Sequence, residues 1–229
     1  MKVLFCGYRD WAHALFHDLM ATKHNVKFHL VNDEKTLESC TRHERWDIVL
    51  LVGWSWIVPD DIINNNLVMC IHPSDLPDYA GGSPLQNQIL DGMTRTKVTL
   101  FKVDSGIDTG DIFDKRPMSL EGHVQDVFNS LIRASSELIS DFIDKYPNHV
   151  LTPQREMGPG FVRKRLKPAQ SQLFPSDIQK MTCRELWNFI RCRENPYPNA
   201  FLKDETGTLI FKRVEFDDPG KDKKNAGND

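Results

Sequence analysis

The chain has 229 residues, 40% of them hydrophobic, and its 29 basic and 32 acidic residues give a formal net charge of −3. This composition is typical of a folded protein with a sizeable core and excludes a chain that is disordered throughout. A general nucleic-acid binder needs a basic excess, and no apolar run approaches the roughly 20 residues that cross a bilayer. We therefore expect neither general nucleic-acid binding nor a membrane-spanning segment.

The cysteines are odd in number and widely scattered along the chain. They are Cys6, Cys40, Cys70, Cys183 and Cys192. None belongs to a CxxC motif or to a paired Cys/His spacing, so we expect reduced thiols, no metal site and a cytoplasmic location. The apolar start of the chain is too short for a signal peptide, because Arg9 and Asp10 end it.

Short apolar runs alternate with a helical pattern over the first third of the chain. Runs at 2–7, 25–31, 47–53 and 67–72 predict strands, and apolar residues on one helical face predict a helix over 11–20. The run at 47–53 is apolar throughout, which is typical of a strand covered on both faces of a parallel sheet. We therefore predict an α/β fold with a doubly wound, Rossmann-like and mostly parallel sheet.

The second half of the chain predicts one more strand, two helices and a hairpin. The strand is predicted over 97–103, and apolar residues on one face predict a long helix over 124–142, which Pro147 ends. A last helix is predicted over 182–192. A β-hairpin is predicted with strands at 201–202 and 208–216.

The stretch at 158–168 contains Gly-Pro-Gly and a basic run, which favours a linker or loop. We therefore predict a catalytic core over 1–150 and a small C-terminal extension, with a loop, a helix and a hairpin, over 151–216. Residues 217–229 have no potential to form a core, so we expect a disordered tail there.

Ligands of open α/β sheets bind outside the carboxyl ends of the strands. Gly7–Asp10 follows the first predicted strand but lacks the GxGxxG spacing, so we expect no dinucleotide cradle there. Gly53–Pro59 follows a buried strand and contains two tryptophans. These indoles either cap the core or present a flat face to a ligand.

A histidine and a loop of aspartates also lie at this edge. His72 ends the predicted strand at 67–72, and a proline follows it. The loop at 103–111 contains Asp104, Asp108 and Asp111 among glycines. These aspartates either only make turns, or pair with the imidazole for acid–base chemistry, and spacing alone leaves both interpretations open.

Three motifs together resemble the formyltransferase family, whose members use N10-formyltetrahydrofolate. They are Cys-Ile-His-Pro-Ser-Asp-Leu-Pro at 70–77, Gly-Gly-Ser-Pro-Leu-Gln at 81–86 and Asp-Ser-Gly-Ile-Asp-Thr-Gly at 104–110. Their order and spacing are similar to the family's Asn-x-His-Pro-Ser-x-Leu-Pro stretch and Asp-x-Gly-x-Asp-x-Gly loop. A late segment at 195–201 is similar to the family's Pro-x-Pro segment, so the resemblance covers nearly the whole chain.

The resemblance implies a role for each part of the site. His72 is expected to take the proton of an attacking amine, and Asp108 to orient the imidazole and relay a proton. Two loops are expected to hold the pterin through Trp54, Ser55, Trp56, Ile57, Val58, Asp104, Ser105, Gly106 and Ile107. The substrate-binding residues expected are Tyr79, Gly81, Gly82, Ser83, Pro84, Gln86, Arg163, Arg165 and Tyr197.

Cys70 departs from the family pattern, because it occupies the position of the asparagine. In the family that amide helps to hold the formyl oxygen as negative charge develops on it. A thiol is a weak donor, and losing such a donor typically costs about 3 kcal/mol. Either Gln86 or a backbone amide replaces it, or the reaction is slow, or the chain is a non-catalytic folate-binding homologue. We favour replacement, because His72 and Asp108 are both present.

The expected acceptor is a nucleotide-linked amino sugar, because the chain most resembles the small sugar N-formyltransferases. Methionyl-tRNA formyltransferases, the alternative, carry a further basic domain, and glycinamide ribonucleotide formyltransferases bind phosphate with a glycine-rich loop that 7–10 lacks. Arg163, Lys164 and Arg165 either meet a diphosphate or form a solvated charge run. The nucleotide, the sugar and the oligomeric state stay open, with a homodimer as one option.

Overall fold

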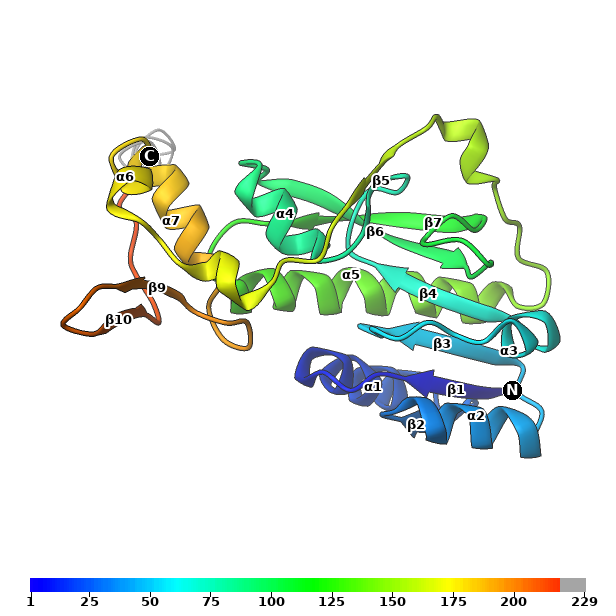
Figure 1. The fold of residues 1–229 in the computed structure, drawn as a ribbon. Helices are drawn as coiled ribbons and strands as arrows, with labels where there is room; N and C mark the ends of the chain where they lie inside the picture. Colours follow the sequence, from blue (N-terminus) through cyan, green and yellow to red (C-terminus); the bar gives the residue numbers. More distant parts are fainter. Residues whose placement is uncertain (219–229) are drawn as a thin grey trace, which may run out of the picture.

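The computed structural model describes residues 1–218 of the chain, which fold around a six-stranded mixed sheet (Figure 1). Its strands are β1 Lys2–Cys6, β2 Lys27–Val31, β3 Ile48–Val52, β4 Val68–His72, β6 Arg95–Lys102 and β7 Ile112–Ser119. The order across the sheet is β2, β1, β3, β4, β6, β7. The first four are parallel, β6 is antiparallel to β4, and β7 is antiparallel to β6. The predicted α/β fold with a mostly parallel sheet is confirmed.

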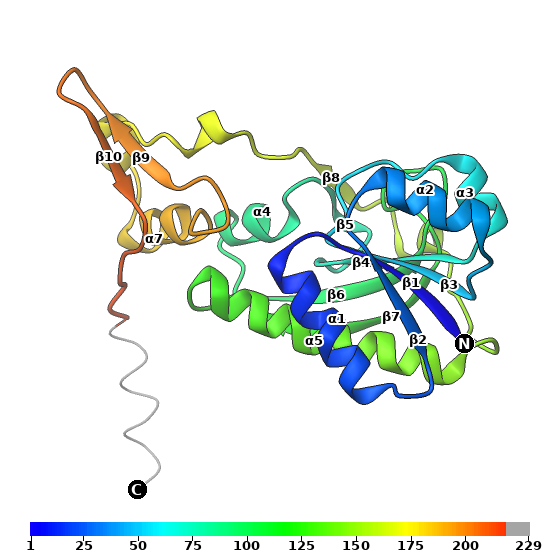
Figure 2. The ribbon, with the colours of Figure 1, turned by 90° about the horizontal axis from the view of Figure 1, so that it is seen from below.

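Helices cover both faces of this sheet. Ile48, Leu50 and Val52 of β3 face a core cluster that includes α1 (Asp10–Thr22) and α5 (Val124–Lys145), which pack against each other (Figure 2). The alternate residues of β3, Val49 and Leu51, face α2 (Glu34–His43) and α3 (Asp60–Asn65). Successive strand residues point to opposite faces, so burial on both sides explains why this run is apolar throughout.

Besides β8 and the one-turn helices described below, the sequence patterns do not predict five of the observed elements, and each of these is short or largely polar. They are α2, α3, β5 (Asp78–Gly81), α4 (Pro84–Leu90) and β7. Within α2 only Leu37 is buried, so the helix shows no apolar stripe. The edge strand β7 leaves most of its residues partly exposed and contains Pro117, which an edge strand tolerates.

The stretch predicted as a linker contains a short strand. β8 (Phe161–Arg163) pairs in parallel with β5, and the amide of Gly82 continues the ladder by donating to the carbonyl of Arg163 (2.8 Å). The prediction of a loop there is therefore wrong for these residues. β8 is too short to show the alternation of apolar and polar residues that predicts a strand, so only its pairing with β5 identifies it.

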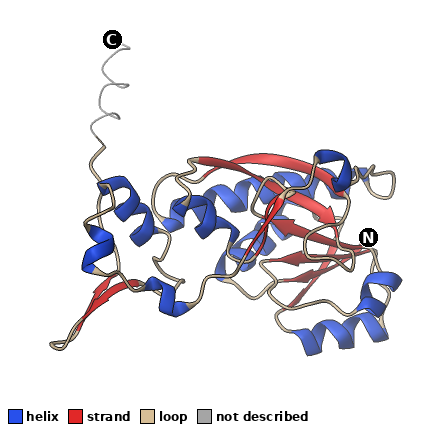
Figure 3. Cartoon of the chain, turned by 45° about the horizontal axis from the view of Figure 1, so that its top comes forward, coloured by secondary structure: helices blue, strands red, loops and turns tan. Residues whose placement is uncertain are grey.

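The elements that follow β8 lie at one end of the sheet (Figure 3). They are the one-turn helices at Pro168–Ser171 and α6 (Pro175–Ile178), then α7 (Cys183–Arg191) and the hairpin of β9 (Ala200–Lys203) and β10 (Thr208–Phe211). A one-turn helix at Gln154–Met157 precedes β8 and lies apart from them. The helix and hairpin predictions are confirmed, although the second strand ends at Phe211. The predicted tail, 217–229, lies almost entirely outside the described residues.

Buried polar contacts attach α7 to the sheet domain. The Arg191 guanidinium donates to the carbonyls of Leu120 (2.7 Å) and Gly122 (2.8 Å), and burial lowers its pKa to about 10. Gln86 Nε2 of α4 donates to the carbonyl of Cys192 (3.1 Å). None of the helices within residues 1–218 is long and apolar enough to span a membrane.

Candidate active site

His72 lies at the carboxyl end of β4 and is buried, with 6% of its surface exposed. Its Nε2 lies 3.0 Å from the carbonyl oxygen of Tyr79, and its Nδ1 lies 3.4 Å from Oδ2 of Asp108. Both neighbours only accept hydrogen bonds, and the contact of Nε2 is the shorter, so we assign the proton of the neutral ring to Nε2. Nδ1 then presents a lone pair beside a carboxylate. A proton taken up at Nδ1 would be stabilised by that carboxylate.

The loop that follows β4 is held in place by side chains from neighbouring elements. Thr99 donates to the carbonyl of Ser74 (2.7 Å), and Gln88 donates to the carbonyl of Pro73 (2.8 Å). The hydroxyl of Ser74 donates in turn to the carbonyl of Asp78 (2.7 Å). The carbonyl of Tyr79 that fixes the imidazole therefore belongs to a constrained segment.

Asp108 comes from the loop between β6 and β7 and adopts a left-handed conformation with φ +55°. Its Oδ2 accepts a hydrogen bond from the amide of Gly81 (2.8 Å), which aims the carboxylate at His72. The buried side chain of Gln154 donates to the carbonyls of Asp108 (2.9 Å) and Gly110 (2.7 Å). A Cβ on Gly110 would lie 1.7 Å from the carbonyl oxygen of Lys102, so the loop is also fixed by close packing.

Both interpretations of the aspartate loop hold, for different residues. Asp104 Oδ1 accepts from the amide of Gly106 (3.0 Å) and the hydroxyl of Thr109 (2.7 Å), so its side chain shapes the turn. Asp108 instead reaches the imidazole. The loop therefore combines a turn-forming aspartate with one that pairs with His72.

Cys70 lies on the same face of β4 as His72, because the two are separated by one residue. Its thiol makes only a weak hydrogen bond to the carbonyl of Ile71 (3.6 Å). Burial, and then the negative charge of Asp108, raise the pKa of this thiol well above its ordinary value. The group therefore stays a neutral thiol beside the His72–Asp108 pair.

The loop after β3 presents aromatic and apolar groups. Trp54 and Trp56 lie 4.8 Å apart, and Tyr8 lies 4.6 Å from Trp56, measured between ring centroids. The indole N–H of Trp54 is buried and has no hydrogen-bond partner among the described residues. Ile57 is 89% exposed, and Ile107 of the second expected pterin loop is 66% exposed. Exposed apolar surface with an unpaired buried donor fits a flat heterocycle that carries acceptor atoms.

The expected substrate residues fall into a connected group and two outliers. Gly81, Gly82 and Ser83 pack against the segment after β8: a Cβ on Gly82 would lie 2.4 Å from the amide nitrogen of Arg165, and Ser83 Oγ accepts from the amide of Leu166 (3.1 Å). Pro84 begins α4 directly after them. Gln86 points away to Cys192.

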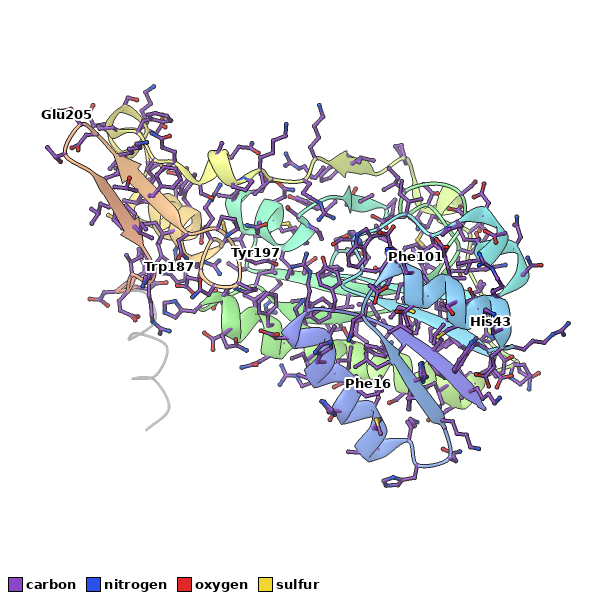
Figure 4. All side chains as sticks on the ribbon, turned by 60° about the horizontal axis from the view of Figure 1, so that its bottom comes forward. Phe16, His43, Phe101, Trp187, Tyr197 and Glu205 are labelled. Carbon is purple, nitrogen blue, oxygen red and sulfur yellow. The ribbon has the colours of Figure 1, made fainter. Side chains whose placement is uncertain are left out.

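Tyr197 is the second outlier and lies where the C-terminal elements meet the sheet domain (Figure 4). Its ring centroid is 6.0 Å from that of Phe128, and burial raises its phenol pKa to about 12. It therefore serves as a neutral packing residue in this structure.

The two arginines expected to meet substrate have different partners. Arg163 forms an ion pair with Asp91 and stacks over Tyr79, whose hydroxyl donates to the same carboxylate (2.8 Å). Arg165 instead donates to Ser55 Oγ (3.4 Å) in the loop after β3.

Sequence reasoning missed Arg9, Asp91 and Gln154 as contributors to this region. Arg9 donates to Ser55 Oγ (3.4 Å), but the loop after β1 has no motif that points to it. Asp91 and Gln154 lie in no motif, so only the folded chain shows what they contact. Within residues 1–218 no cluster of His, Cys, Asp and Glu could hold a metal ion.

Comparisons with known proteins agree with these motifs. The family model described as Formyl transferase matches residues 5–128, more than half of the chain. A methionyl-tRNA formyltransferase of Rickettsia massiliae (strain Mtu5) is 30% identical over 174 residues, which are 74% of this chain and 56% of that protein. The chain thus spans about half the length of the curated relatives it matches.

Solved structures share the fold over most of the described chain. A methionyl-tRNA formyltransferase from Clostridium thermocellum has a TM-score of 0.82 and 28% identity and covers 95% of this chain and 94% of its own. A sugar N-formyltransferase from Shewanella has a TM-score of 0.75 and 17% identity, with 95% and 99% covered. HypX from Aquifex aeolicus in complex with tetrahydrofolic acid has a TM-score of 0.71 and 17% identity, with 89% and 36% covered.

Proposed function

The chain belongs to the formyl transferase family, whose members are enzymes that use formyltetrahydrofolate, and we propose that it formylates the amine of a nucleotide-linked amino sugar. The observation that carries the proposal is the position of the buried His72 ring, with Nδ1 3.4 Å from Asp108 Oδ2 and Nε2 3.0 Å from the carbonyl oxygen of Tyr79. A buried base with a carboxylate at the nitrogen that accepts the proton is suited to activating an amine.

The chemistry is one acyl exchange. N10-formyltetrahydrofolate supplies the formyl carbon as the electrophile. The substrate amine adds to the formyl carbon, whose oxygen takes up negative charge, and the C–N10 bond then breaks. In this exchange the amine loses one proton and N10 gains one. His72 Nδ1 takes the proton of the amine, and Asp108 stabilises the imidazolium that results. The pair then serves as the source of the proton that N10 gains.

Two loops of the chain are suited to holding the donor. Trp54 and Ile57 offer apolar surface, and the buried Trp54 indole N–H has no hydrogen-bond partner among the described residues. Ile107 offers a second apolar surface in the loop that carries Asp108. These residues orient the donor and exclude water from the reacting carbon, while His72 and Asp108 handle the proton.

Cys70 leaves the oxyanion with weaker support than an asparagine would give. The thiol remains neutral, so it adds no repulsive charge to a developing oxyanion, but it is a weak donor. Gln86, one of the replacements considered, already donates to Cys192. The backbone amides near the end of β4 and in the loop of Asp108 are therefore the favoured donors in this proposal.

A methionyl-tRNA acceptor is the second candidate, because the relatives near 30% identity are methionyl-tRNA formyltransferases. The formal charge of −3 supports the nucleotide sugar instead, since a large RNA acceptor favours a basic surface. We also propose a cytoplasmic location, which fits the free cysteines.

The test offers formyltetrahydrofolate with a panel of nucleotide-linked amino sugars, and separately with methionyl-tRNA, and detects the gained formyl group by mass spectrometry. We expect formylation of at least one amino sugar and none in the His72→Asn variant, with the melting temperature little changed. Formylation of methionyl-tRNA alone would select the second candidate. Binding of tetrahydrofolate with no transfer to any amine would identify a non-catalytic homologue.

A further inference from the structure

Two guanidinium groups converge on one hydroxyl at the carboxyl-terminal edge of the sheet. Arg9 follows β1, Arg165 follows β8, and each places a guanidinium nitrogen 3.4 Å from Ser55 Oγ in the loop after β3. Neither arginine forms an ion pair with a carboxylate within residues 1–218. Unpaired guanidinium groups that meet at one point repel each other, so an arrangement of this kind favours a bound anion.

The hydroxyl at the centre offers too few acceptor sites for its neighbours. The phenol of Tyr8 also donates to Ser55 Oγ (2.7 Å), so three side chains donate to one hydroxyl oxygen. Such an oxygen has two lone pairs, whereas each guanidinium has five N–H donors. The cluster of Tyr8, Arg9, Ser55 and Arg165, called the arginine cluster below, is therefore rich in donors and poor in acceptors.

The arginine cluster is held by close packing to the sheet edge. A Cβ on Gly53 would lie 3.3 Å from Cδ of Arg9, so the stem of Arg9 runs across the end of β3. The guanidinium of Arg9 also sits 5.0 Å from the ring centroid of Tyr8. The side chain of Arg9 is thus ordered before an anion binds, which lowers the conformational entropy that the side chain loses on binding.

The cluster also adjoins the catalytic pair. The backbone of Arg165 lies against Gly82, where an added Cβ would meet its amide nitrogen at 2.4 Å. The preceding residue, Gly81, donates its amide hydrogen to Asp108. The backbone segment that carries Arg165 is therefore connected through Gly82 and Gly81 to Asp108. Arg163, two residues earlier, is neutralised by Asp91 and does not compete for this role.

We propose that the arginine cluster is an anion subsite that binds the diphosphate of the nucleotide-linked substrate and directs its amine to His72. The inference rests on the proposed function for the identity of the substrate. A diphosphate carries acceptor oxygens on two neighbouring phosphorus atoms, so it can engage both guanidinium groups at once. A carboxylate of the folate glutamate offers two oxygens, which one arginine fork already satisfies.

The test measures the affinity of the full chain for inorganic pyrophosphate and for tetrahydrofolate by titration calorimetry. Arg9→Ala and Arg165→Ala are each expected to raise the Kd for pyrophosphate about ten-fold or more and to leave the Kd for tetrahydrofolate within about two-fold. Arg42→Ala is the matched control, because Arg42 is exposed in the last turn of α2, at the opposite edge of the sheet. It removes the same charge and should leave both affinities unchanged.

Unchanged pyrophosphate affinity in both arginine variants would overturn the proposal. Weaker tetrahydrofolate binding with unchanged pyrophosphate binding would also overturn it, by assigning the cluster to the glutamate of the folate. Arg9→Lys and Arg165→Lys, which retain the charge, guard against a folding defect and should restore part of the pyrophosphate affinity. If pyrophosphate binding depends on both arginines but no amino sugar is formylated, the subsite stands and the proposed acceptor fails.

Discussion

His72 Nδ1 lies 3.4 Å from Asp108 Oδ2, on the side of the ring opposite the nitrogen that the carbonyl of Tyr79 holds. In a Ser-His-Asp triad the carboxylate bonds to the ring nitrogen that does not take the proton. Here the carboxylate adjoins the lone pair itself. The backbone carbonyl of Tyr79 thus sets the tautomer, and Asp108 is left to stabilise the charged ring.

Asp108→Asn tests this division of roles. Asparagine tolerates the left-handed backbone at this position and can still accept from the amide of Gly81. It removes the charge that stabilises the imidazolium. We expect kcat to fall by about 100-fold or more while the Kd for tetrahydrofolate changes by less than about five-fold. A lost folate affinity at unchanged kcat would make Asp108 a ligand contact only.

Cys70→Ala tests whether the thiol supports the oxyanion. A thiol is a weak donor, so we expect kcat to fall by less than about ten-fold, or 1.4 kcal/mol of transition-state stabilisation. Cys70→Asn should match or exceed the wild-type rate, because an amide donor then occupies the position where charge develops. Cys183→Ala, which alters an exposed thiol, is the control. A larger loss in Cys70→Ala at unchanged melting temperature would assign the oxyanion to the sulfur.

The pKa of Cys70 predicts slow alkylation. Burial and the charge of Asp108 both favour the protonated thiol, so the reactive thiolate forms only at a pH above the ordinary pKa of a cysteine. With iodoacetamide we expect the exposed Cys183 to react first and Cys70 only as the pH rises. Asp108→Asn should speed the labelling of Cys70 at a fixed pH, as read by peptide mass spectrometry. Equal rates with and without the Asp108 charge would contradict the proximity of the two groups.

Gln154→Leu tests how the catalytic loop is held. This buried amide donates to the carbonyls of Asp108 and Gly110, and its loss leaves both without that donor. We expect the free energy of unfolding in urea to fall by about 1–3 kcal/mol, and kcat to fall more than folate affinity. Gln125→Leu changes an exposed glutamine on α5 and should alter stability by less than about 0.5 kcal/mol. Equal stability of the two variants would remove Gln154 from the account.

The sequence predicts those parts of the fold in which burial is continuous. The run of β3 is apolar because both of its faces are covered, and α5 shows a stripe because one face packs on the sheet. β7 and α2 escape prediction because each buries few residues. β8 is defined by its pairing with β5, a contact between segments far apart in the chain.

The sequence likewise predicts some residues of the candidate site and not others. His72 and Asp108 stand in motifs whose resemblance to the family implies that they act together, and the structure brings them together. The carbonyl of Tyr79 and the amide of Gly81 have no sequence signature, because every residue carries such groups. Arg9 and Ser55 are far apart in the chain, so only the folded structure shows that Arg9 donates to Ser55 Oγ.

The tautomer of His72 tests the central claim most directly. Nitrogen-15 NMR of the neutral protein separates a ring nitrogen that carries hydrogen from one that does not. We predict that Nε2 carries the hydrogen and that Nδ1 is bare in the uncharged ring. A neutral ring with hydrogen on Nδ1, donated to Asp108, would contradict the account, because the nitrogen beside the carboxylate would then have no lone pair to accept the proton of the amine.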